Sequence, residues 1–383
     1  MAEITIAYIG LGSNLGDRQS AIARAVKILN DTEGAEVVRV SDLIETAALG
    51  RMNQPKYINA VAEIRTSLTA EDLHKHLLHI ETSLGRQRNE KWSPRTIDLD
   101  LLLFGSQVIN RPQLTVPHPQ MHLRSFVLKG LCQLNPELSH PVIREPMKEL
   151  AARLADTDFA PDPDLPQLVS IAGIIGVGKT TLTEKLSDLL GAELIFEAYD
   201  TNPYLSDVYA GKKQFALDSQ LYFLTSRAAQ LNRSTLAKGR IIISDYVFNK
   251  ELIYARRLLN AEQLTLYEQI YPPFAAAITA PVLVIYLTDS AKNCLDRIHR
   301  RNRPYEQAIK KEFLEALGSD YDRLFAGWKT SPVIRKQVSG LDKTAEINHL
   351  ADQIKYYVAA PSVIASAPVA KPAKQSKTIV SGK

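Results

Sequence analysis

Residues 170–182 read SIAGIIGVGKTTL, and this stretch decides the fold of the second half of the chain. Gly173, Gly178, Lys179 and Thr180 fit the pattern G-x-x-x-x-G-K-[ST]. In this pattern glycine N–H groups wrap phosphates, the lysine reaches the outer phosphates and the hydroxyl ligates Mg²⁺. Apolar residues predict a short buried strand before the pattern and an amphipathic helix after it. Phosphates would therefore meet a helix N-terminus, where anions bind favourably.

The composition is that of an ordinary globular protein. Its 383 residues are 45% hydrophobic and 23% charged, and the length suggests two or three domains. The net charge of +4 is uneven, because residues 1–165 carry 18 Lys+Arg against 21 Asp+Glu, whereas the remainder carries 28 against 21. No basic stripe alternates with aromatic residues, so anionic small molecules are expected as partners and nucleic acid is not.

Cysteine usage and hydropathy indicate the compartment. Cys132 and Cys294 are the two cysteines, and neither has a metal-ligand spacing. We expect both in the core of a protein from a reducing compartment, without a disulfide or zinc framework. No signal-peptide pattern and no apolar run of about 18 residues occurs, so we expect a cytoplasmic protein without membrane partners.

The first half begins with an alternating strand over residues 3–9, and the glycine-rich stretch 10–16 is interpreted as a tight turn. A dinucleotide-binding loop is excluded, because G-x-G-x-x-G needs glycine where Leu15 stands. Asp17 can cap a helix that reaches about residue 29. Strands over 36–40 and 57–65 and a helix over 70–84 follow.

The densest chemistry of this half lies in residues 85–104 (GRQRNEKWSPRTIDLDLLLF). A strand over 96–104 would place Asp98 and Asp100 on one face, about 7 Å apart. Two carboxylates on an otherwise apolar strand either bind a cation such as Mg²⁺ or form the polar face of an edge strand. Nearby arginines favour phosphate oxygens over a merely solvated loop.

Three motifs of this half carry a family resemblance: AYIGLGSNLG (7–16), WSPRTIDLDL (92–101) and LTVPHPQMHLRSF (114–126). Together they resemble the 6-hydroxymethyl-dihydropterin pyrophosphokinases. The resemblance implies a ferredoxin-like α+β fold and two Mg²⁺ ions bridging ATP on Asp98 and Asp100. It implies phosphate or ATP contacts from Glu81, Arg86, Trp92, Arg95, His118 and Arg124, with Arg86 and Arg95 catalytic. It also implies a pterin pocket made by Thr46, Leu49, Tyr57, Asn59 and Phe126.

Two positions depart from the pattern of this family. The family often has two prolines where Ala47 and Ala48 stand, so the loop on the pterin side is expected to be less rigid. Asn89 occupies a position where a basic residue is expected. Neither departure affects the metal carboxylates.

Domain boundaries follow from composition. Residues 1–157 form the first domain, the acidic and proline-rich residues 158–167 a linker, residues 168–358 the second domain, and residues 359–383 a disordered low-complexity tail. The second domain alternates strands and helices, which indicates an α/β fold with a parallel sheet. Its expected elements are strands at 192–196, 240–244, 281–287 and near 333, and helices at 214–238, 261–271, 290–300, 305–325 and 344–357.

The second half carries its own resemblance. The stretches 196–205, 215–227 and 296–306, together with the phosphate loop, resemble the deoxynucleoside kinases of the deoxyadenosine and deoxyguanosine type. The resemblance implies Glu197 as general base, Asp245 at the metal, and nucleoside contacts from Tyr209, Gln220, Arg227, Glu251 and Glu306. It implies a lid of Arg297, Arg301 and Arg303, ATP contacts that include Gly176 and Thr181, and a homodimer.

Position 246 departs from this second family. The family commonly has arginine after the acidic residue, and Tyr246 stands there instead. Either Lys250 or a lid arginine compensates, or this half is slow, altered in substrate or degenerate. The alternatives are a thymidylate-type monophosphate kinase and a non-catalytic nucleotide-binding or dimerisation module. The sequence thus predicts a fusion with two ATP- and Mg²⁺-dependent sites, one for a reduced pterin and one for a deoxynucleoside.

Overall fold

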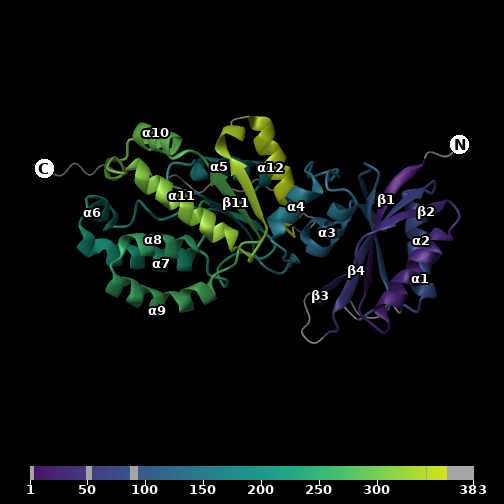
Figure 1. Ribbon diagram of the computed structural model, residues 1–383. Coiled ribbons are helices and arrows are strands. Elements are labelled where there is room, and N and C mark those ends of the chain that lie inside the picture. The colour runs from purple at the N-terminus through teal and green to yellow at the C-terminus, as the bar shows by residue number, and fades with distance from the viewer. Residues whose placement is uncertain (1–3, 49–53, 87–93, 342, 360–383) are drawn as a thin grey trace.

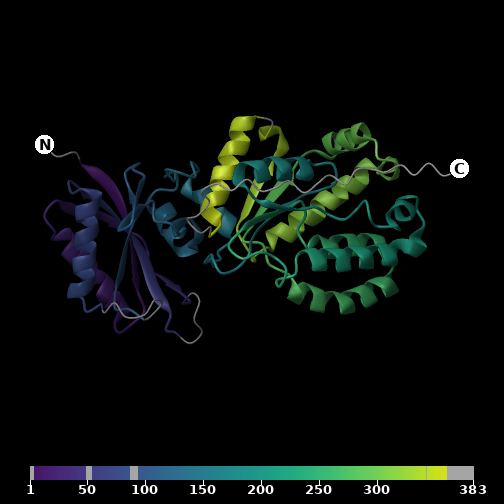
Figure 2. The ribbon, with the colours of Figure 1, turned by 180° about the vertical axis from the view of Figure 1, so that it is seen from behind.

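A computed structural model describes residues 4–48, 54–86, 94–341 and 343–359. The chain forms two bodies, each built around its own five-stranded sheet (Figure 1). Among the described segments, no helix combines the length and hydropathy needed to cross a membrane. Figure 2 shows the same two bodies from behind.

The first body is an antiparallel sheet in the order β2-β4-β1-β5, with β3 paired to β4. A short ribbon of β6 and β7 lies beside it. Its elements are β1 (Thr5–Ser13), α1 (Arg18–Asn30), β2 (Ala35–Val40), β3 (Ile44–Thr46), β4 (Tyr57–Thr66), α2 (Ala70–Ser83), β5 (Asp98–Phe104), β6 (Ile109–Arg111), β7 (Leu114–Val116), the 3-10 turn η1 (Met121–Leu123), α3 (Ser125–Leu134) and α4 (Met147–Leu154).

Helices cover both faces of this sheet, so its central strands are apolar on both sides. Ala7, Ile9 and Leu11 of β1 pack on the face of α1 and α2, while Tyr8 packs with α3 and α4 on the other face. The Asp17 carboxylate caps α1 by accepting a hydrogen bond from Ser20 N–H, as predicted.

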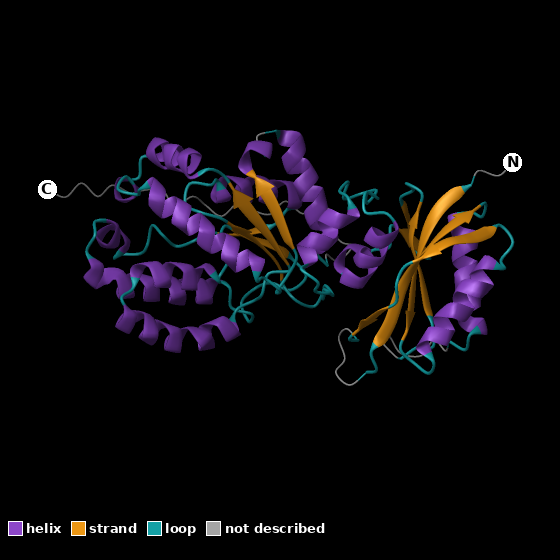
Figure 3. Ribbon diagram, viewed as in Figure 1, coloured by secondary structure: helices purple, strands orange, loops and turns teal. Residues whose placement is uncertain are grey.

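The second body is a wholly parallel sheet in the order β12-β11-β8-β10-β9 with helices around it (Figure 3). This confirms the predicted parallel α/β architecture. Its elements are β8 (Gln167–Ala172), α5 (Lys179–Leu190), β9 (Glu193–Ile195), α6 (Leu205–Tyr209), η2 (Lys213–Phe215), α7 (Ala216–Gln230), β10 (Ile241–Ser244), α8 (Lys250–Leu258), α9 (Ala261–Ala277), β11 (Leu283–Thr288), α10 (Ala291–Arg301), η3 (Pro304–Glu306), α11 (Lys311–Ala326), β12 (Val333–Gln337), η4 (Val338–Gly340) and α12 (Thr344–Tyr357).

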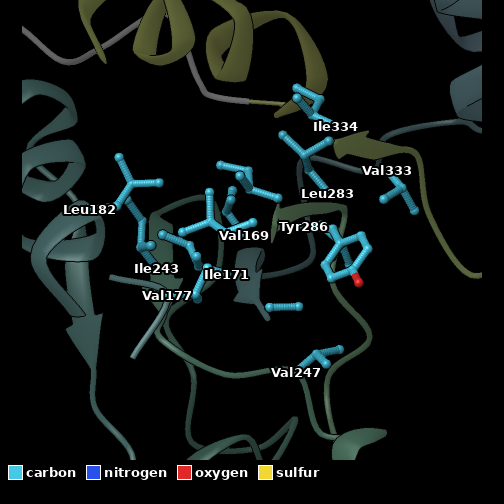
Figure 4. Packing of buried hydrophobic residues seen from close by; sticks show 14 of the residues in the cluster. Val169, Ile171, Val177, Leu182, Ile243, Val247, Leu283, Tyr286, Val333 and Ile334 are labelled. Atoms are coloured by element: carbon cyan, nitrogen blue, oxygen red, sulfur yellow. The ribbon is translucent and has the colours of Figure 1, made fainter. Parts of the chain in front are cut away.

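The core of this body lies between the sheet and its helices. Val169 and Ile171 of β8, Ile243 of β10 and Leu283 of β11 are fully buried and pack with Leu182 of α5 (Figure 4). This core fixes β8, β9 and β10 in parallel, so their carboxyl ends open on the same edge of the sheet, where α/β proteins bind ligands.

The two bodies are packed against each other. Leu123 of η1 belongs to the core cluster of the second body, and Tyr356 of α12 packs on that of the first. The ring of the buried His122 lies 4.9 Å from that of Tyr357, and its Nε2 is 2.9 Å from the Tyr356 carbonyl. Cys294 is buried as expected, whereas Cys132 is only half-buried.

Four element boundaries correct the sequence predictions. β1 continues through Gly10 and Gly12 to Ser13, where a turn was expected over residues 10–16, because β4 and β5 pair with it over this length. α7 ends at Gln230, not 238, because the next residues pair with the segment around Ile278. α9 runs on through two prolines to residue 277, and α11 begins at 311, after η3.

Candidate active sites

The first cavity, of about 540 Å³, lies beside β1, β4 and β5 and reaches the segment that contains η1. The fold brings together here all the described residues that the first resemblance singled out. The cavity is lined by Thr46, Tyr57, Asn59, Glu81, Arg86, Arg95, Asp98, Asp100, His118, Arg124 and Phe126. Leu49 and Trp92 lie outside the described residues.

One end of this cavity is a charged cluster around Asp98. Arg86 Nη1 lies 2.5 Å from one oxygen of Asp98, and Arg95 Nη1 lies 2.7 Å from the other. Arg86 also bonds the buried carboxylate of Glu81, which in turn accepts a 2.8 Å hydrogen bond from Leu99 N–H. Glu81 therefore holds both the arginine and the start of β5, so it positions this cluster.

Asp100 faces the cavity two residues along β5. Its side chain is open to the cavity, but the surrounding protein desolvates the carboxylate and, with the charge of Asp98, raises its pKa to about 7. No group of three or more His, Cys, Asp or Glu within the described ranges could hold a metal alone. Two carboxylates nevertheless fit Mg²⁺, because this ion keeps waters and takes further oxygens from bound phosphates.

The other side of the cavity combines aromatic rings with an amide. Asn59 Nδ2 donates a 2.9 Å hydrogen bond to Thr46 Oγ1, which fixes the amide at the cavity wall. A Cβ at Gly12 would stand 3.1 Å from Asn59 Oδ1, so glycine there leaves room for this amide. Tyr57 and Phe126 supply two ring faces. A flat, hydrogen-bonding ligand matches these groups.

His118 and Arg124 close the cavity on the side of η1. Burial and the charge of Arg124 lower the pKa of His118 to about 4, so the imidazole is neutral at pH 7. Arg124 Nη2 donates a 2.7 Å hydrogen bond to Gln120 Oε1. One neutral hydrogen-bonding group and one guanidinium therefore face the ligand from this segment.

The second cavity, of about 380 Å³, opens at the carboxyl ends of β8, β9 and β10. The predicted phosphate loop runs from β8 into α5 along it. Gly173, Gly176 and Gly178 have φ of 142°, 79° and 99°, and a Cβ at Gly176 would come within 2.5 Å of the Cys294 carbonyl oxygen. The loop therefore needs glycine for both conformation and space.

Lys179 lies inside this loop. Its Nζ donates 2.9 Å hydrogen bonds to the carbonyls of Gly173 and Ile174. Burial and, next, the charge of Lys250 lower the Lys179 pKa to about 8. The next residue, Thr180, donates a 2.8 Å hydrogen bond to Asp245 at the end of β10. Hydroxyl and carboxylate together form the oxygen pair expected beside Mg²⁺.

Glu197 follows β9 and is the centre of a buried charged network. Its backbone N–H donates to Asp245 Oδ1 at 2.8 Å. Its carboxylate pairs with Arg227 of α7 and accepts hydrogen bonds from Lys250 Nζ at 2.8 and 2.7 Å. Burial alone would raise the Glu197 pKa, but the charges of Arg227 and Lys250 outweigh it and hold the pKa well below its ordinary range.

The remaining predicted nucleoside residues divide into two groups. Gln220, Arg227, Tyr209 and Glu306 line the cavity, and Gln220 Oε1 is buried without a hydrogen-bond partner in the described part of the chain. Glu251 does not line the cavity. It is fully buried behind Arg227, which it pairs with, and accepts a hydrogen bond from Tyr267. The expectation that Glu251 touches the base is therefore corrected: it holds Arg227 in place.

Of the three arginines predicted in the lid, two line the cavity and one does not. Arg301 and Arg303 line the cavity, where Arg301 pairs with Glu306 at 2.6 Å and Arg303 stacks on Tyr199 at 4.1 Å. Arg297 instead pairs with Asp289 and donates a 3.2 Å hydrogen bond to the Gly176 carbonyl. Arg297 therefore supports the phosphate loop from the side away from the cavity. Thr181, which was also predicted to contact ATP, is exposed on the first turn of α5.

Comparison with known proteins matches each body to a different family. The 7,8-dihydro-6-hydroxymethylpterin-pyrophosphokinase model matches residues 8–136, and the deoxynucleoside kinase model matches residues 169–359. A Bacillus subtilis hydroxymethyldihydropteridine pyrophosphokinase is 44% identical over 129 residues, 34% of this chain and 77% of the relative. A Bacillus subtilis deoxyguanosine kinase is 38% identical over 157 residues, 40% of this chain and 76% of the relative.

The chain belongs to both families. It is a bifunctional transferase with two ATP-using kinase activities, pyrophosphoryl transfer to hydroxymethyldihydropterin and phosphorylation of deoxynucleosides. A solved deoxyadenosine kinase from M. mycoides with bound dATP also aligns, with 25% identity and a TM-score of 0.44 over 49% of this chain and 99% of that one. The family match of the second half favours the deoxynucleoside kinase prediction over the monophosphate-kinase alternative.

Two residues of the kinase cavity had no definite role in the sequence prediction. Tyr199 accepts a hydrogen bond from Arg303 and stacks on its guanidinium, and it lies in a loop whose sequence has no hydrophobic periodicity. Lys250 was considered only as a possible substitute for the missing arginine, and no helix was predicted around it. Its signal was a lysine five residues after Asp245 at the start of an apolar-periodic stretch, which α8 now explains.

Proposed function

We propose that the pyrophosphokinase and deoxynucleoside kinase reactions proceed independently in the two cavities. The observation that supports this is the separation of the sites: no described residue lines both cavities, and each has its own carboxylates and its own cations. A single shared ATP site would need residues from both sheets, and the cavities lie on separate ones.

In the pyrophosphokinase domain, Tyr57 and Phe126 stack on the reduced pterin while Asn59 and Thr46 hydrogen-bond its edge. Arg86 and Arg95, which pair with Asp98 in the free chain, bind the phosphates of ATP. Asp98 would then be available to hold Mg²⁺, which would neutralise phosphate oxygens. Arg124 and neutral His118 hold the phosphates from the opposite side. The hydroxymethyl oxygen attacks the β-phosphorus, the bond to the α-phosphate oxygen breaks, and AMP leaves.

In the kinase domain, Gln220 and Arg227 bind the base, and Tyr209 with Glu306 binds the sugar. Glu197 orients the 5′-hydroxyl and accepts its proton while the oxygen attacks the γ-phosphorus. The bond to the β-phosphate oxygen breaks and ADP leaves. Phosphoryl transfer depends mainly on positioning and charge neutralisation. Arg301 and Arg303 supply further positive charge to the phosphates.

Magnesium fits both domains, where it would neutralise phosphate oxygens. Asp98 and Asp100 would hold it in the first, and Thr180 with Asp245 in the second. We extend the proposal to a ferredoxin-like class for the first domain, supported by its strand order β2-β4-β1-β5. The expected boundaries at 157, 168 and 358 and a homodimer through the kinase domain belong to the same proposal.

The test follows AMP and ADP separately. Purified chain is incubated with Mg·ATP and one acceptor at a time: hydroxymethyldihydropterin, each deoxynucleoside or each nucleoside monophosphate. Asp98→Asn should abolish AMP formation and leave ADP formation unchanged, and Lys179→Met should do the reverse. Each variant is thus the control for the other. Equal loss of both products in either variant would contradict two independent sites, and ADP formed only with nucleoside monophosphates would contradict the acceptor.

A further inference from the structure

Lys250 is a buried ammonium group in the wall of the kinase cavity. Its side chain is only 5% exposed, yet the residue lines the cavity and its Nζ contacts both carboxylate oxygens of Glu197. A buried lysine is costly unless its charge is used, because burial disfavours the ammonium form. In the free chain Lys250 balances Glu197, because Arg227 is shared between Glu197 and Glu251.

The position of Lys250 is at the phosphate end of the cavity. Glu197, its partner, is joined through Asp245 to Thr180 of the phosphate loop by two hydrogen bonds of 2.8 Å. Lys250 also lies near enough to Lys179 for the two ammonium charges to repel appreciably. Two buried ammonium groups that repel each other across one cavity form a site for a multiply charged anion, which relieves the repulsion.

Tyr246 cannot supply this charge. The residue that replaces the arginine of related kinases is fully buried, and its hydroxyl donates a 2.7 Å hydrogen bond to Gln230 of α7. Arg227 is not free to do so either, because Glu197 and Glu251 both bind its guanidinium. Among the described residues Lys250 pairs with one carboxylate, that of Glu197, and its stem is flexible, so it can turn toward a phosphate.

We propose that Lys250 is a catalytic residue of the kinase domain and contacts the transferred γ-phosphoryl group in place of the arginine absent at position 246. This inference rests on the proposed kinase function. In the free protein Lys250 is held by Glu197. When the 5′-hydroxyl binds Glu197, Lys250 moves to a γ-phosphate oxygen and neutralises charge there as the bond to ADP breaks. The proton of the hydroxyl passes to Glu197, and Lys250 stays protonated throughout.

Lys250→Gln removes the charge, and Lys250→Arg keeps it. For ADP formation with the preferred deoxynucleoside, Lys250→Gln should lower kcat at least about 100-fold, as loss of one positioned donor does elsewhere. The KM for ATP should stay within about threefold, because the interaction is made mainly in the transition state. Lys250→Arg should retain kcat within about tenfold of the wild type. AMP formation by the pyrophosphokinase domain should be unchanged in both.

The control is Lys212→Gln in the same domain, where an exposed lysine pairs with Asp207 at the surface and ADP formation should not change. A Lys250→Gln kcat within threefold of wild type would overturn the assignment, as would a raised KM with unchanged kcat. ATP binding by Lys250→Gln is checked by the rise in its thermal unfolding midpoint when ATP is added. If that rise is absent, Lys250→Arg becomes the deciding variant. A 100-fold loss of kcat in Lys250→Arg with ATP still bound would then overturn the assignment. Wild-type chain that makes no ADP with any deoxynucleoside would refute the kinase function itself, and this assignment with it.

Discussion

Glu145 holds the two domains together, and its removal should destabilise their contact. Its carboxylate pairs with Arg153 of α4, accepts a 2.7 Å hydrogen bond from Gln353 of α12 and lies 3.4 Å from Lys336 of β12. Burial pushes its pKa upward, but the hydrogen bond and charge of Arg153 outweigh burial and lower the pKa to about 2. The side chain is 17% exposed, so solvent screens these interactions only weakly.

This pKa gives the size of the effect. A fall from 4.5 in the unfolded chain to about 2 is worth about 3 kcal/mol at pH 7, at roughly 1.4 kcal/mol per pH unit. Because the folded pKa is depressed, the contribution is complete above pH 4.5 and is lost as pH falls through 2. About half of it should remain at pH 3. Glu145→Gln should therefore cost about 3 kcal/mol at pH 7 and roughly 1.5 kcal/mol at pH 3.

Urea unfolding of the wild type and Glu145→Gln at pH 7 and pH 3 measures this difference in the free energy of unfolding. Each domain is followed by its own activity, because two domains need not unfold in one step. Asp352→Asn is the matched control, since it removes an exposed pair with Lys355 on α12 and should cost less than about 0.5 kcal/mol. A Glu145→Gln cost below about 0.5 kcal/mol at pH 7, or an equal cost at pH 7 and pH 3, would refute the reasoning.

Two further predictions concern the kinase domain. Gly176→Ala places a Cβ 2.5 Å from the Cys294 carbonyl oxygen at a φ of 79°. ADP formation should therefore fall at least tenfold while AMP formation persists. Normal ADP formation would show that the loop adapts. Tyr246→Phe loses the hydrogen bond to Gln230 and should lower the free energy of unfolding by about 1 kcal/mol with kcat unchanged. A fall in kcat of more than tenfold would instead show that Tyr246 takes part in catalysis. Thermal unfolding and ADP assays measure both.

The sequence predicted most accurately the features that depend on local residue patterns. The strands and the carboxylate pair at Asp98 and Asp100 follow from alternation, and the phosphate loop follows from glycines whose conformation and space the fold indeed requires. The end of α7 was wrong, because Thr279 N–H binds the Leu231 carbonyl across 48 positions of sequence and takes the chain out of the helix. Such pairing has no local signature.

The charged residues were harder to assign than the elements. Lys250 and Glu251 are neighbours on α8, yet Lys250 faces the cavity and Glu251 is buried behind Arg227. Helical spacing places them about 100° apart, but which of the two faces the ligand depends on how α8 packs against α7. The resemblance assigned Glu251 to the base. Only the packing shows that the carboxylate positions the arginine and that the lysine lines the cavity beside Glu197.

The contact between the domains includes a segment of seven residues, from His118 to Arg124, that serves both. His118 and Arg124 face the pyrophosphokinase cavity, while His122 and Leu123 between them are buried against α12 and the kinase core. Burial lowers the His122 pKa to about 3, so the ring stays neutral at pH 7 and adds no buried charge to this contact. The two sites share no described residue, but the chain that carries two groups of the first cavity rests directly on the second domain. Separate chemistry and joint packing are therefore compatible in one molecule.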